Sequence, residues 1–266
     1  MKLSIIIPTF NERDNVRVLT DRIDAAMSNL KLGYEIWFVD DSRDETTALL
    51  EEVSKERSHV HYLHRDNGRG LATAVVTGFE KANGKYLVVM DADLQHPPEL
   101  LPTILKSLED GAEVVIPSRF VQGGTDGGLS LVRKFVSLTA RMIGQIAIPR
   151  LRNVSDCTGG YFGLHRSVIE GIDLSPIGWK ILLEILVKGR YQAVREIPYS
   201  FQPRDAGESK MSITELLNYL RHLLRLVMYS REDRRFYSYC FFGTLSVLIC
   251  IFCGHFCKVQ YIAELF

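Results

Sequence analysis

Short apolar runs alternate with longer amphipathic stretches along the first half of the chain, and this alternation restricts the fold most. Each apolar run has the length of a β-strand, and each amphipathic stretch repeats its apolar residues at helical spacing. Strands are predicted over residues 3–7, 34–39, 60–63, 86–90 and 114–116. Helices are predicted over residues 16–30, 46–55, 71–82 and 100–108. Such βαβ units predict an α/β fold, with a mostly parallel sheet flanked by helices.

The pattern is less regular after residue 119. Helices are predicted over residues 130–148 and 180–188, and strands over 157–164 and 194–200. Residues 204–210 show no periodicity and are predicted to form a loop.

Length and charge limit the classes of function. A chain of 266 residues is long enough for one α/β domain with an appendage. Its 32 Lys and Arg residues balance 32 Asp and Glu residues, so no global basic field attracts nucleic acid. Four of the five cysteines lie in an apolar C-terminal stretch. Cys250 and Cys253 have the spacing of a metal or redox pair, but their apolar surroundings favour small buried side chains.

An acidic motif, Asp91-Ala92-Asp93-Leu94-Gln95, directly follows the apolar run of residues 86–90. If the chain stays extended there, Asp91, Asp93 and Gln95 point to the same side, because side chains alternate along a strand. Two carboxylates and an amide oxygen suit a hard divalent cation, which usually also holds a phosphate. A solvated turn is the alternative, which three oxygen ligands on one side disfavour. Ligands of open α/β sheets bind at this end of the strands.

Other residues are expected at the same sheet edge. Asp40 and Asp41 follow the second predicted strand, where a carboxylate would accept hydrogen bonds from a base or a ribose, and Glu12 follows the first strand. Gly68-Arg69-Gly70 either lets the backbone approach a phosphate or is only a turn.

Several cations are candidates for binding phosphate, with surface solvation as the alternative for each. Arg119 ends the fifth predicted strand and is the best placed. The others lie near loops or helix starts and are Arg133, Lys134, Lys180, Arg204 and Lys210. Arg204 and Lys210 flank a glycine and Ser209, which suggests a lid over an anionic ligand. His96 borders the acidic motif and is expected to pack or to cap the next helix.

The C-terminal part has the features of a membrane-associated segment. Residues 213–229 predict an amphipathic helix, with Leu216, Leu217, Leu220, Leu223, Leu224 and Val227 on the apolar side and Arg221, His222 and Arg225 on the cationic side. A helix packed on its own domain is the alternative. Residues 236–257 contain no Asp, Glu, Lys or Arg, which predicts one transmembrane helix over a buried or dimer helix.

These features divide the chain into three parts. Residues 1–210 are the predicted catalytic domain, 211–235 an amphipathic interfacial region and 236–266 a membrane anchor. Arg231, Arg234 and Arg235 precede the apolar stretch, and the positive-inside rule therefore places the catalytic domain on the cytoplasmic side of the membrane.

Five motifs together resemble one family. They are Ile6-Ile7-Pro8-Thr9-Phe10-Asn11-Glu12, Val39-Asp40-Asp41-Ser42, Asp91-Ala92-Asp93-Leu94-Gln95-His96-Pro97-Pro98, Ser118-Arg119-Phe120 and Gly207-Glu208-Ser209-Lys210. They occur in the same order in the dolichol-phosphate mannose synthases of glycosyltransferase family 2, which have the Rossmann-like GT-A fold. The resemblance covers about residues 1–230, and the apolar tail resembles the anchoring region of longer members.

The resemblance implies roles for matching residues. Pro8, Phe10, Glu12, Val39 and Asp41 would hold the guanosine of GDP-mannose. Asp91, Ala92 and Asp93 would contact the phosphates and the metal, and Asp93 and Gln95 would ligate Mg²⁺ or Mn²⁺. Arg119, Arg204 and Lys210 would clamp phosphates, and Arg133 would face the lipid phosphate. Asp93 and Arg119 are the residues expected to be catalytic.

The chain departs from the family pattern at three places. Phe10 replaces a usual Tyr, Ser42-Arg43-Asp44 replaces a usual Ser-Pro-Asp, and residues 156–161 replace a usual Ser-Gly-Phe. None of these departures lies in the acidic motif.

The expected activity is therefore an inverting, membrane-associated transfer of mannose from GDP-mannose to dolichyl (polyprenyl) phosphate. Three alternatives stay open. A UDP-glucose-dependent polyprenyl-phosphate glucosyltransferase would share every motif. A nucleotidyltransferase would use a similar sheet and metal but has no need of a membrane tail. A non-catalytic nucleotide-sugar sensor would bind without turnover.

Overall fold

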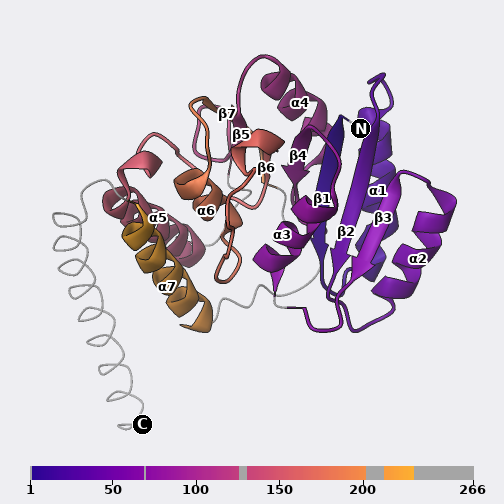
Figure 1. Cartoon of the computed structure of the whole chain (residues 1–266), viewed down its shortest axis with the longest axis horizontal. Helices are drawn as coiled ribbons and strands as arrows, with labels where there is room; N and C mark the ends of the chain where they lie inside the picture. Colours follow the sequence, from indigo (N-terminus) through magenta and orange to yellow (C-terminus); the bar gives the residue numbers. More distant parts are fainter. Residues whose placement is uncertain (1, 69, 126–130, 202–212, 231–266) are drawn as a thin grey trace, which may run out of the picture.

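The computed structural model describes residues 2–68, 70–125, 131–201 and 213–230, which form three layers with a seven-stranded sheet in the middle (Figure 1). The strands are β1 (Leu3–Thr9), β2 (Tyr34–Asp40), β3 (Val60–His64), β4 (Tyr86–Val89), β5 (Val114–Ser118), β6 (Phe162–His165) and β7 (Val194–Pro198). The α-helices are α1 (Arg13–Met27), α2 (Thr46–Glu56), α3 (Leu71–Lys81), α4 (Leu101–Glu109), α5 (Leu131–Ala147), α6 (Ile181–Lys188) and α7 (Ile213–Tyr229). Short 3-10 helices span Pro98–Leu100, Pro149–Leu151 and Arg166–Val168.

The predicted mostly parallel α/β sheet is confirmed. Its strand order is β3-β2-β1-β4-β6-β5-β7. β1 pairs in parallel with β2 and β4, β2 with β3, and β5 with β7. Only β6 among the described strands runs antiparallel to its neighbours. The parallel strands therefore end at one edge of the sheet, and the loops that follow them meet there.

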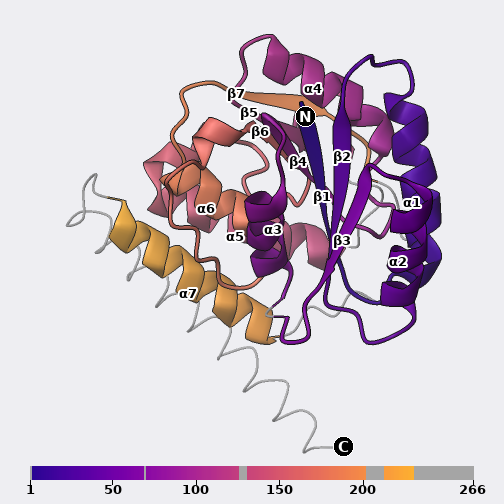
Figure 2. The same ribbon diagram turned by 45° about the vertical axis from the view of Figure 1, so that its right-hand side comes forward.

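Helices cover both faces of the sheet, because successive strand residues point to opposite faces and both sets are apolar. Ile6, Leu87 and Val89 face α3, α6 and α7 in one core cluster. Ile5 and Val88 face α1, α2 and α4 in the other. Figure 2 shows α1 and α2 beside β2 and β3, while α3, α6 and α7 lie on the opposite side of the sheet.

The predicted strand over residues 157–164 is shorter in the structure. Its first residues form turns, and β6 begins only at Phe162. The carbonyl oxygen of Thr158 accepts a hydrogen bond from Lys180 Nζ at 2.9 Å, so a side chain rather than a neighbouring strand satisfies it. Gly159 and Gly160 follow directly, and glycines inside a strand pattern weaken the strand.

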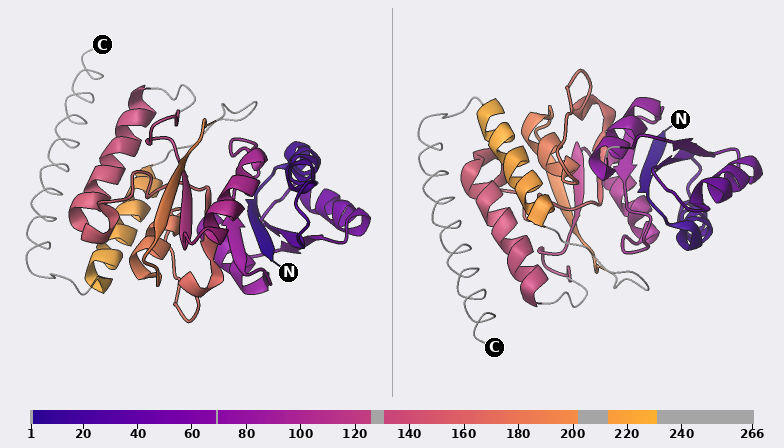
Figure 3. Two further views of the ribbon diagram at one scale, coloured as in Figure 1. Left: turned by 90° about the horizontal axis from the view of Figure 1, so that it is seen from above. Right: turned by 90° about the horizontal axis from the view of Figure 1, so that it is seen from below.

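The amphipathic helix α7 packs on the catalytic domain. Tyr219, Leu223 and Leu226 are buried in the same core cluster as the sheet. Both views of Figure 3 place α7 beside α5. The prediction that His222 lies on an exposed cationic side is wrong, because His222 is 1% exposed. Leu217, Met228 and Tyr229 are the large apolar side chains that the described part of α7 exposes.

The described residues contain no helix that is both long and apolar enough to cross a bilayer. The predicted transmembrane stretch, residues 236–257, lies outside the described residues.

A buried charged cluster attaches α7 to α6. Glu184 is 1% exposed, and its carboxylate lies 2.5 Å from Lys188 Nζ and 3.2 Å from His222 Nε2. The backbone N–H of Ser175 also donates to it at 3.0 Å. Burial acts to raise the pKa of the Glu184 carboxyl, but these three hydrogen bonds outweigh it and lower the pKa below 4.5. The ionised carboxylate is therefore the form that stabilises the fold.

We expect Glu184→Gln to destabilise the protein by about 3 kcal/mol, because it leaves the buried ammonium group of Lys188 without its counter-charge. Urea denaturation measures the difference. The matched control is Glu51→Gln, which removes the exposed pair between Glu51 and Lys55 at the same i,i+4 spacing and is expected to change stability little.

The pH dependence has a defined sign. The pKa of Glu184 is lower in the folded protein than the ordinary value of 4.5. Its contribution to the free energy of unfolding is therefore fully present above pH 4.5 and is lost as the pH falls through the lowered pKa of the folded state. Wild type and Glu184→Gln are therefore expected to converge in stability below pH 4.5. If the free energies of unfolding of wild type and Glu184→Gln differ by the same amount at neutral and acidic pH, Glu184 does not titrate in this way.

Candidate active site

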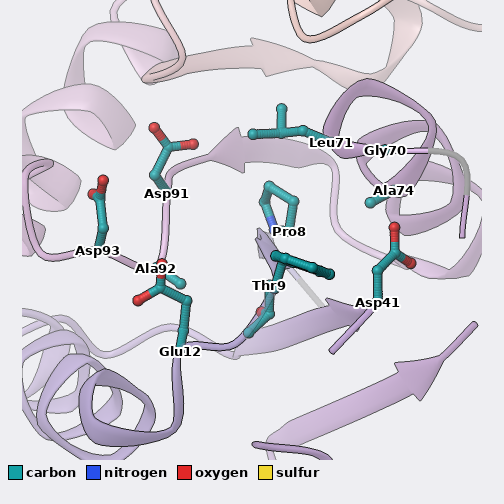
Figure 4. Close-up of a pocket in the computed structure, with 11 residues that line it drawn as sticks. Pro8, Thr9, Glu12, Asp41, Gly70, Leu71, Ala74, Asp91, Ala92 and Asp93 are labelled. Atoms are coloured by element: carbon teal, nitrogen blue, oxygen red, sulfur yellow. The ribbon is translucent and has the colours of Figure 1, made fainter. Parts of the chain in front are cut away.

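A pocket of about 300 Å³ opens at the carboxyl-terminal edge of β1, β2 and β4 (Figure 4). Its lining comes from the loops after these strands and from the start of α3. The lining residues are Pro8, Thr9, Phe10, Glu12, Asp41, Gly70, Leu71, Ala74, Asp91, Ala92 and Asp93. The sheet edge that the strand pattern predicted is thus the edge that carries a pocket.

Most of the residues predicted to bind substrate line this pocket. They are Pro8, Phe10, Glu12, Asp41, Asp91, Ala92 and Asp93. Val39 is different, because it is fully buried in β2 and is not part of the lining. Gln95 and Arg119 also lie outside the lining.

The acidic motif is a turn rather than an extended strand. β4 ends at Val89, and Leu94 has a left-handed backbone with φ of 63°. Asp93 Oδ1 accepts a hydrogen bond from the backbone N–H of Gln95 at 3.2 Å, as in a side-chain-stabilised turn. The alternation argument for this motif is therefore wrong, although Asp91 and Asp93 both line the pocket and their carboxylates point to the same side in Figure 4.

His96 and residues 160–161 hold the start of the motif. The backbone N–H of Asp91 donates to His96 Nδ1 at 3.0 Å, and the His96 ring stacks on Tyr161 with centroids 5.1 Å apart. The packing role predicted for His96 is thus confirmed. A Cβ at Gly160 would lie 3.2 Å from Asp91 Oδ2, so a side chain at this position would crowd the carboxylate.

The donor set of the motif fits a hard cation. No group of three or more His, Cys, Asp or Glu side chains suited to a metal occurs within the part of the chain that the structure describes. A cation at Asp91 and Asp93 would therefore take its remaining ligands from Gln95, water or substrate. Mg²⁺ is commonly held in this way, by one or two carboxylates together with substrate phosphates.

Hydrogen bonds join the loop after β1 to the loop after β2. Asn11 has a φ of 57°, and its backbone N–H donates to Ser42 Oγ at 2.7 Å. Asn11 Oδ1 accepts from the backbone N–H of Arg43 at 2.9 Å. A proline at position 43, usual in the family that the motifs resemble, has no N–H to donate. Arg43 therefore adds a contact that helps to position Phe10, whose side chain is 58% exposed.

Arg119 lies in a buried ion pair. Its Nε lies 3.1 Å and its Nη2 3.4 Å from the carboxylate oxygens of Asp156, which is 1% exposed. Glu196 accepts from the backbone N–H of Asp156 at 3.0 Å and from both N–H and Oγ of Ser155. Asp156, in a segment where the chain departs from the usual pattern, thus orients the predicted phosphate-binding arginine.

Lys180 adds a second cation near this pair. Its Nζ donates to the carbonyl oxygen of Thr158 at 2.9 Å. Burial lowers the pKa of Lys180, while the Asp156 carboxylate acts in the opposite direction. A positive charge close to Arg119 and Asp156 suits an anionic ligand.

Several of the predicted residues are not among those that the structure describes. Arg204, Ser209 and Lys210 lie outside the described residues, and so do the side chains of Arg133 and Lys134 on α5. Gly68 lies against Asp41, and Gly70 lines the pocket together with Asp41 and the acidic motif. Arg65 and Thr9 were missed by sequence reasoning. Arg65 directly follows β3, so the rule that strand ends share one edge contains the signal that could have found it.

Comparison with known proteins identifies the family. The sequence model described as glycosyl transferase family 2 matches residues 4–173. The chain belongs to glycosyltransferase family 2. Over 250 residues the transferase is 43% identical to a dolichol-phosphate mannosyltransferase of Pyrococcus furiosus, and the match covers 94% of this chain and 70% of that protein.

Two other relatives share this similarity. A dolichol-phosphate mannosyltransferase of Saccharomyces cerevisiae is 37% identical over 240 residues, covering 86% of this chain and 88% of the yeast protein. A polyprenol monophosphomannose synthase of Mycolicibacterium smegmatis is 34% identical over 218 residues, covering 78% and 80%.

Solved structures confirm the GT-A fold. Glucosyl-3-phosphoglycerate synthase from Mycobacterium tuberculosis, crystallised with Mn²⁺, UDP-glucose and glycerol 3-phosphate, has a TM-score of 0.61 at 17% identity. The match covers 86% of this chain and 79% of that one. The same enzyme was also crystallised with Mg²⁺ and UDP.

The close approach of Gly160 to Asp91 gives a test of the motif. Gly160→Ala is expected to reduce the activity of the transferase and to raise the Mn²⁺ concentration needed for half-maximal rate about tenfold, because the new methyl displaces the carboxylate. The matched control is Gly159→Ala, whose Cβ would meet Asp156 at an ordinary 3.5 Å. Equal Mn²⁺ requirements for the two variants would contradict a metal-binding role of Asp91.

Proposed function

We propose that this transferase moves mannose from GDP-mannose to a polyprenyl phosphate such as dolichyl phosphate, releasing GDP. One observation carries the proposal. A single pocket joins the carboxylates of Asp91 and Asp93 to the exposed ring of Phe10 and to Asp41. A nucleotide sugar needs a pocket with two such ends, one that binds its diphosphate with a cation and one that binds its nucleoside.

The relatives favour mannose and a prenyl acceptor. Proteins from three widely separated organisms, at 34–43% identity, are named for dolichol-phosphate or polyprenol mannosyl transfer. The motifs that resemble this family include Pro8, Phe10 and Asp41, which line the pocket. Phe10 offers a flat apolar surface to a base, and Asp41 an acceptor for N–H or O–H donors.

The reaction needs positioning more than proton transfer. An oxygen of the lipid phosphate attacks the anomeric carbon of mannose while the bond from that carbon to the GDP β-phosphate oxygen breaks. The attacking oxygen is already anionic near neutral pH, so no strong general base is required. Displacement from the opposite side inverts the anomeric carbon and gives a β-linked product.

The charges of the site suit this displacement. Asp91, Asp93 and Gln95 would hold Mg²⁺ or Mn²⁺, which neutralises charge on the leaving diphosphate. Asp156 holds the guanidinium of Arg119 in one orientation, and Lys180 lies close by. Fixed positive charge of this kind stabilises a developing negative charge without reorganisation. Arg204 and Lys210 would add phosphate contacts, and Arg133 would contact the lipid phosphate.

The acceptor also implies contact with a membrane. The described parts of α5 and α7 expose apolar side chains that the domain leaves uncovered, among them Leu138, Met142 and Ile146 at intervals of one helical turn on α5. Residues 211–235 would then lie at the membrane surface and residues 236–266 would anchor the chain. The catalytic domain would face the cytoplasm.

A donor competition tests the proposed reaction. Protein reconstituted in membranes is incubated with Mn²⁺, dolichyl phosphate and radiolabelled GDP-mannose or UDP-glucose in parallel. We expect lipid-phase label from GDP-mannose only. Label from UDP-glucose only would replace the donor, and label from neither in folded protein would overturn the proposal.

Substitution of the motif tests the mechanism. Asp93→Ala is expected to lower the rate of mannose transfer at least about a hundredfold, because it removes a charged ligand from the diphosphate end of the pocket. Asp110→Ala is the control, since this exposed aspartate lies after α4 at the opposite edge of the sheet. Near-normal transfer by Asp93→Ala would contradict the mechanism.

A further inference from the structure

Asp41, at the nucleoside end of the pocket, is held by a two-bond ion pair. Arg65 Nε donates to Asp41 Oδ1 at 2.7 Å, and Arg65 Nη2 donates to Asp41 Oδ2 at 2.6 Å. The side chains are only 14% and 13% exposed. Two parallel bonds from a planar guanidinium fix the plane of the carboxylate as well as its position.

Arg65 is itself fixed by α3. Its Nη1 donates to Thr73 Oγ1 at 3.2 Å and to Thr77 Oγ1 at 3.5 Å, and its Nη2 donates to the carbonyl oxygen of Gly70 at 3.2 Å. With the two bonds to Asp41, all five N–H donors of the guanidinium are used. Arg65 thus joins the end of β2 to the first turns of α3 and has no donor left for a ligand.

The backbone closes a further side of Asp41. A Cβ at Gly68 would overlap the Asp41 carboxylate, so only a glycine fits at that position. Gly70, two residues later, lines the same pocket as Asp41. In Figure 4 the Asp41 carboxylate lies beside Ala74 of α3, across the pocket from Asp91. Arg65 and Gly68 therefore hold the carboxylate in place where it lines the pocket.

We propose that Arg65 is a positioning residue for the donor: it holds Asp41 as a fixed hydrogen-bond acceptor for the nucleoside and does not itself touch the nucleotide sugar. This inference rests on the proposed function. The bonds from Arg65 occupy one lone pair on each oxygen of Asp41, and the remaining lone pairs are available to N–H or O–H donors of the nucleoside. We assign the pair to the binding step, because the acidic motif follows β4 and Arg119 follows β5, whereas Asp41 and Arg65 follow β2 and β3.

The test measures the KM for GDP-mannose and kcat separately in two variants of Arg65. In Arg65→Lys the charge remains but the two-bond fork is lost, and in Arg65→Met both are lost. We expect the KM for GDP-mannose to rise at least about tenfold in Arg65→Met and less in Arg65→Lys, with kcat within about twofold of wild type. GDP binding, measured by calorimetry with Mn²⁺ present, is expected to weaken in parallel.

The matched control is Arg22→Lys. Arg22 makes the same fork to Glu99, with Nε and Nη2 at 3.0 and 2.9 Å from the carboxylate oxygens, on the exposed side of α1. Its loss is expected to leave the KM for GDP-mannose and the affinity for GDP unchanged. A rise in KM for both arginine variants would show a general loss of stability instead of a role for Arg65.

A double-mutant cycle shows whether Arg65 acts through Asp41. Asp41→Asn alone is expected to raise the KM, and adding Arg65→Met to it is expected to cause no further rise. A full additional rise in the double mutant would overturn the inference, as would an unchanged KM in both Arg65 variants. Should Arg65→Met not fold, Arg65→Lys with and without Asp41→Asn supplies the same comparison.

The two proposals fail in different ways. If wild-type protein neither binds GDP nor uses GDP-mannose, the proposed function is wrong. If wild-type protein does both while the Arg65 variants keep its KM and its affinity for GDP, only the inference about Arg65 is wrong.

Discussion

Parallel pairing of β1 with both β2 and β4 is the constraint on which the site depends. Ile6 lies opposite Trp37 on one side and Val89 on the other, so the three strands end within a few residues of one another. β1 is buried on both faces, and a shift of one residue would turn its apolar side chains from one core to the other. The register therefore brings the loops after Thr9, Asp40 and Val89 to one place, where they form the pocket.

Charged groups at this edge are held by partners within the protein. Asp40 is fully buried and accepts from Ser42, Thr47 and His64. Asp41 is paired with Arg65. Buried charges are costly unless paired and hydrogen-bonded, so such pairs specify one arrangement of the loops. The loops thus gain the rigidity that a site built on loop residues otherwise lacks.

The site contains one acidic and one mainly basic group of side chains. Asp91 and Asp93 line the pocket, while Arg119 and Lys180 are grouped around Asp156. A diphosphate bound between them, with a divalent cation on the acidic side, would meet positive charge from two directions. This layout explains why a protein with no net charge binds anionic substrates: local arrangement, and not overall charge, supplies the field.

Strand and helix positions over residues 3–118 followed from the sequence, because apolar periodicity there reflects burial on one or two faces. The rule that parallel strands end at one edge of the sheet correctly grouped Glu12, Asp41 and Asp91 at one pocket. The strand prediction was wrong at residues 157–161, where the side chain of Lys180, distant in sequence, donates a hydrogen bond to a backbone carbonyl oxygen.

The apolar stripe of α7 was visible in the sequence, but its partner was not. A stripe of leucines fits a membrane surface and a protein core equally well, and the tertiary structure buried Leu223 and Leu226 against the sheet. His222 followed them inward because Glu184 on α6 meets it there.

The sequence by itself determined the α/β class, the edge that carries the site and the identity of its carboxylates, since these depend on local periodicity and on short motifs. Only the tertiary structure decided that the acidic motif turns, that Asp156 holds Arg119 and that Arg65 holds Asp41. Arg119 and Asp156 are 37 residues apart and Asp41 and Arg65 are 24 apart. Contacts between residues this far apart in the sequence depend on how the strands are ordered in the sheet, which no local pattern encodes.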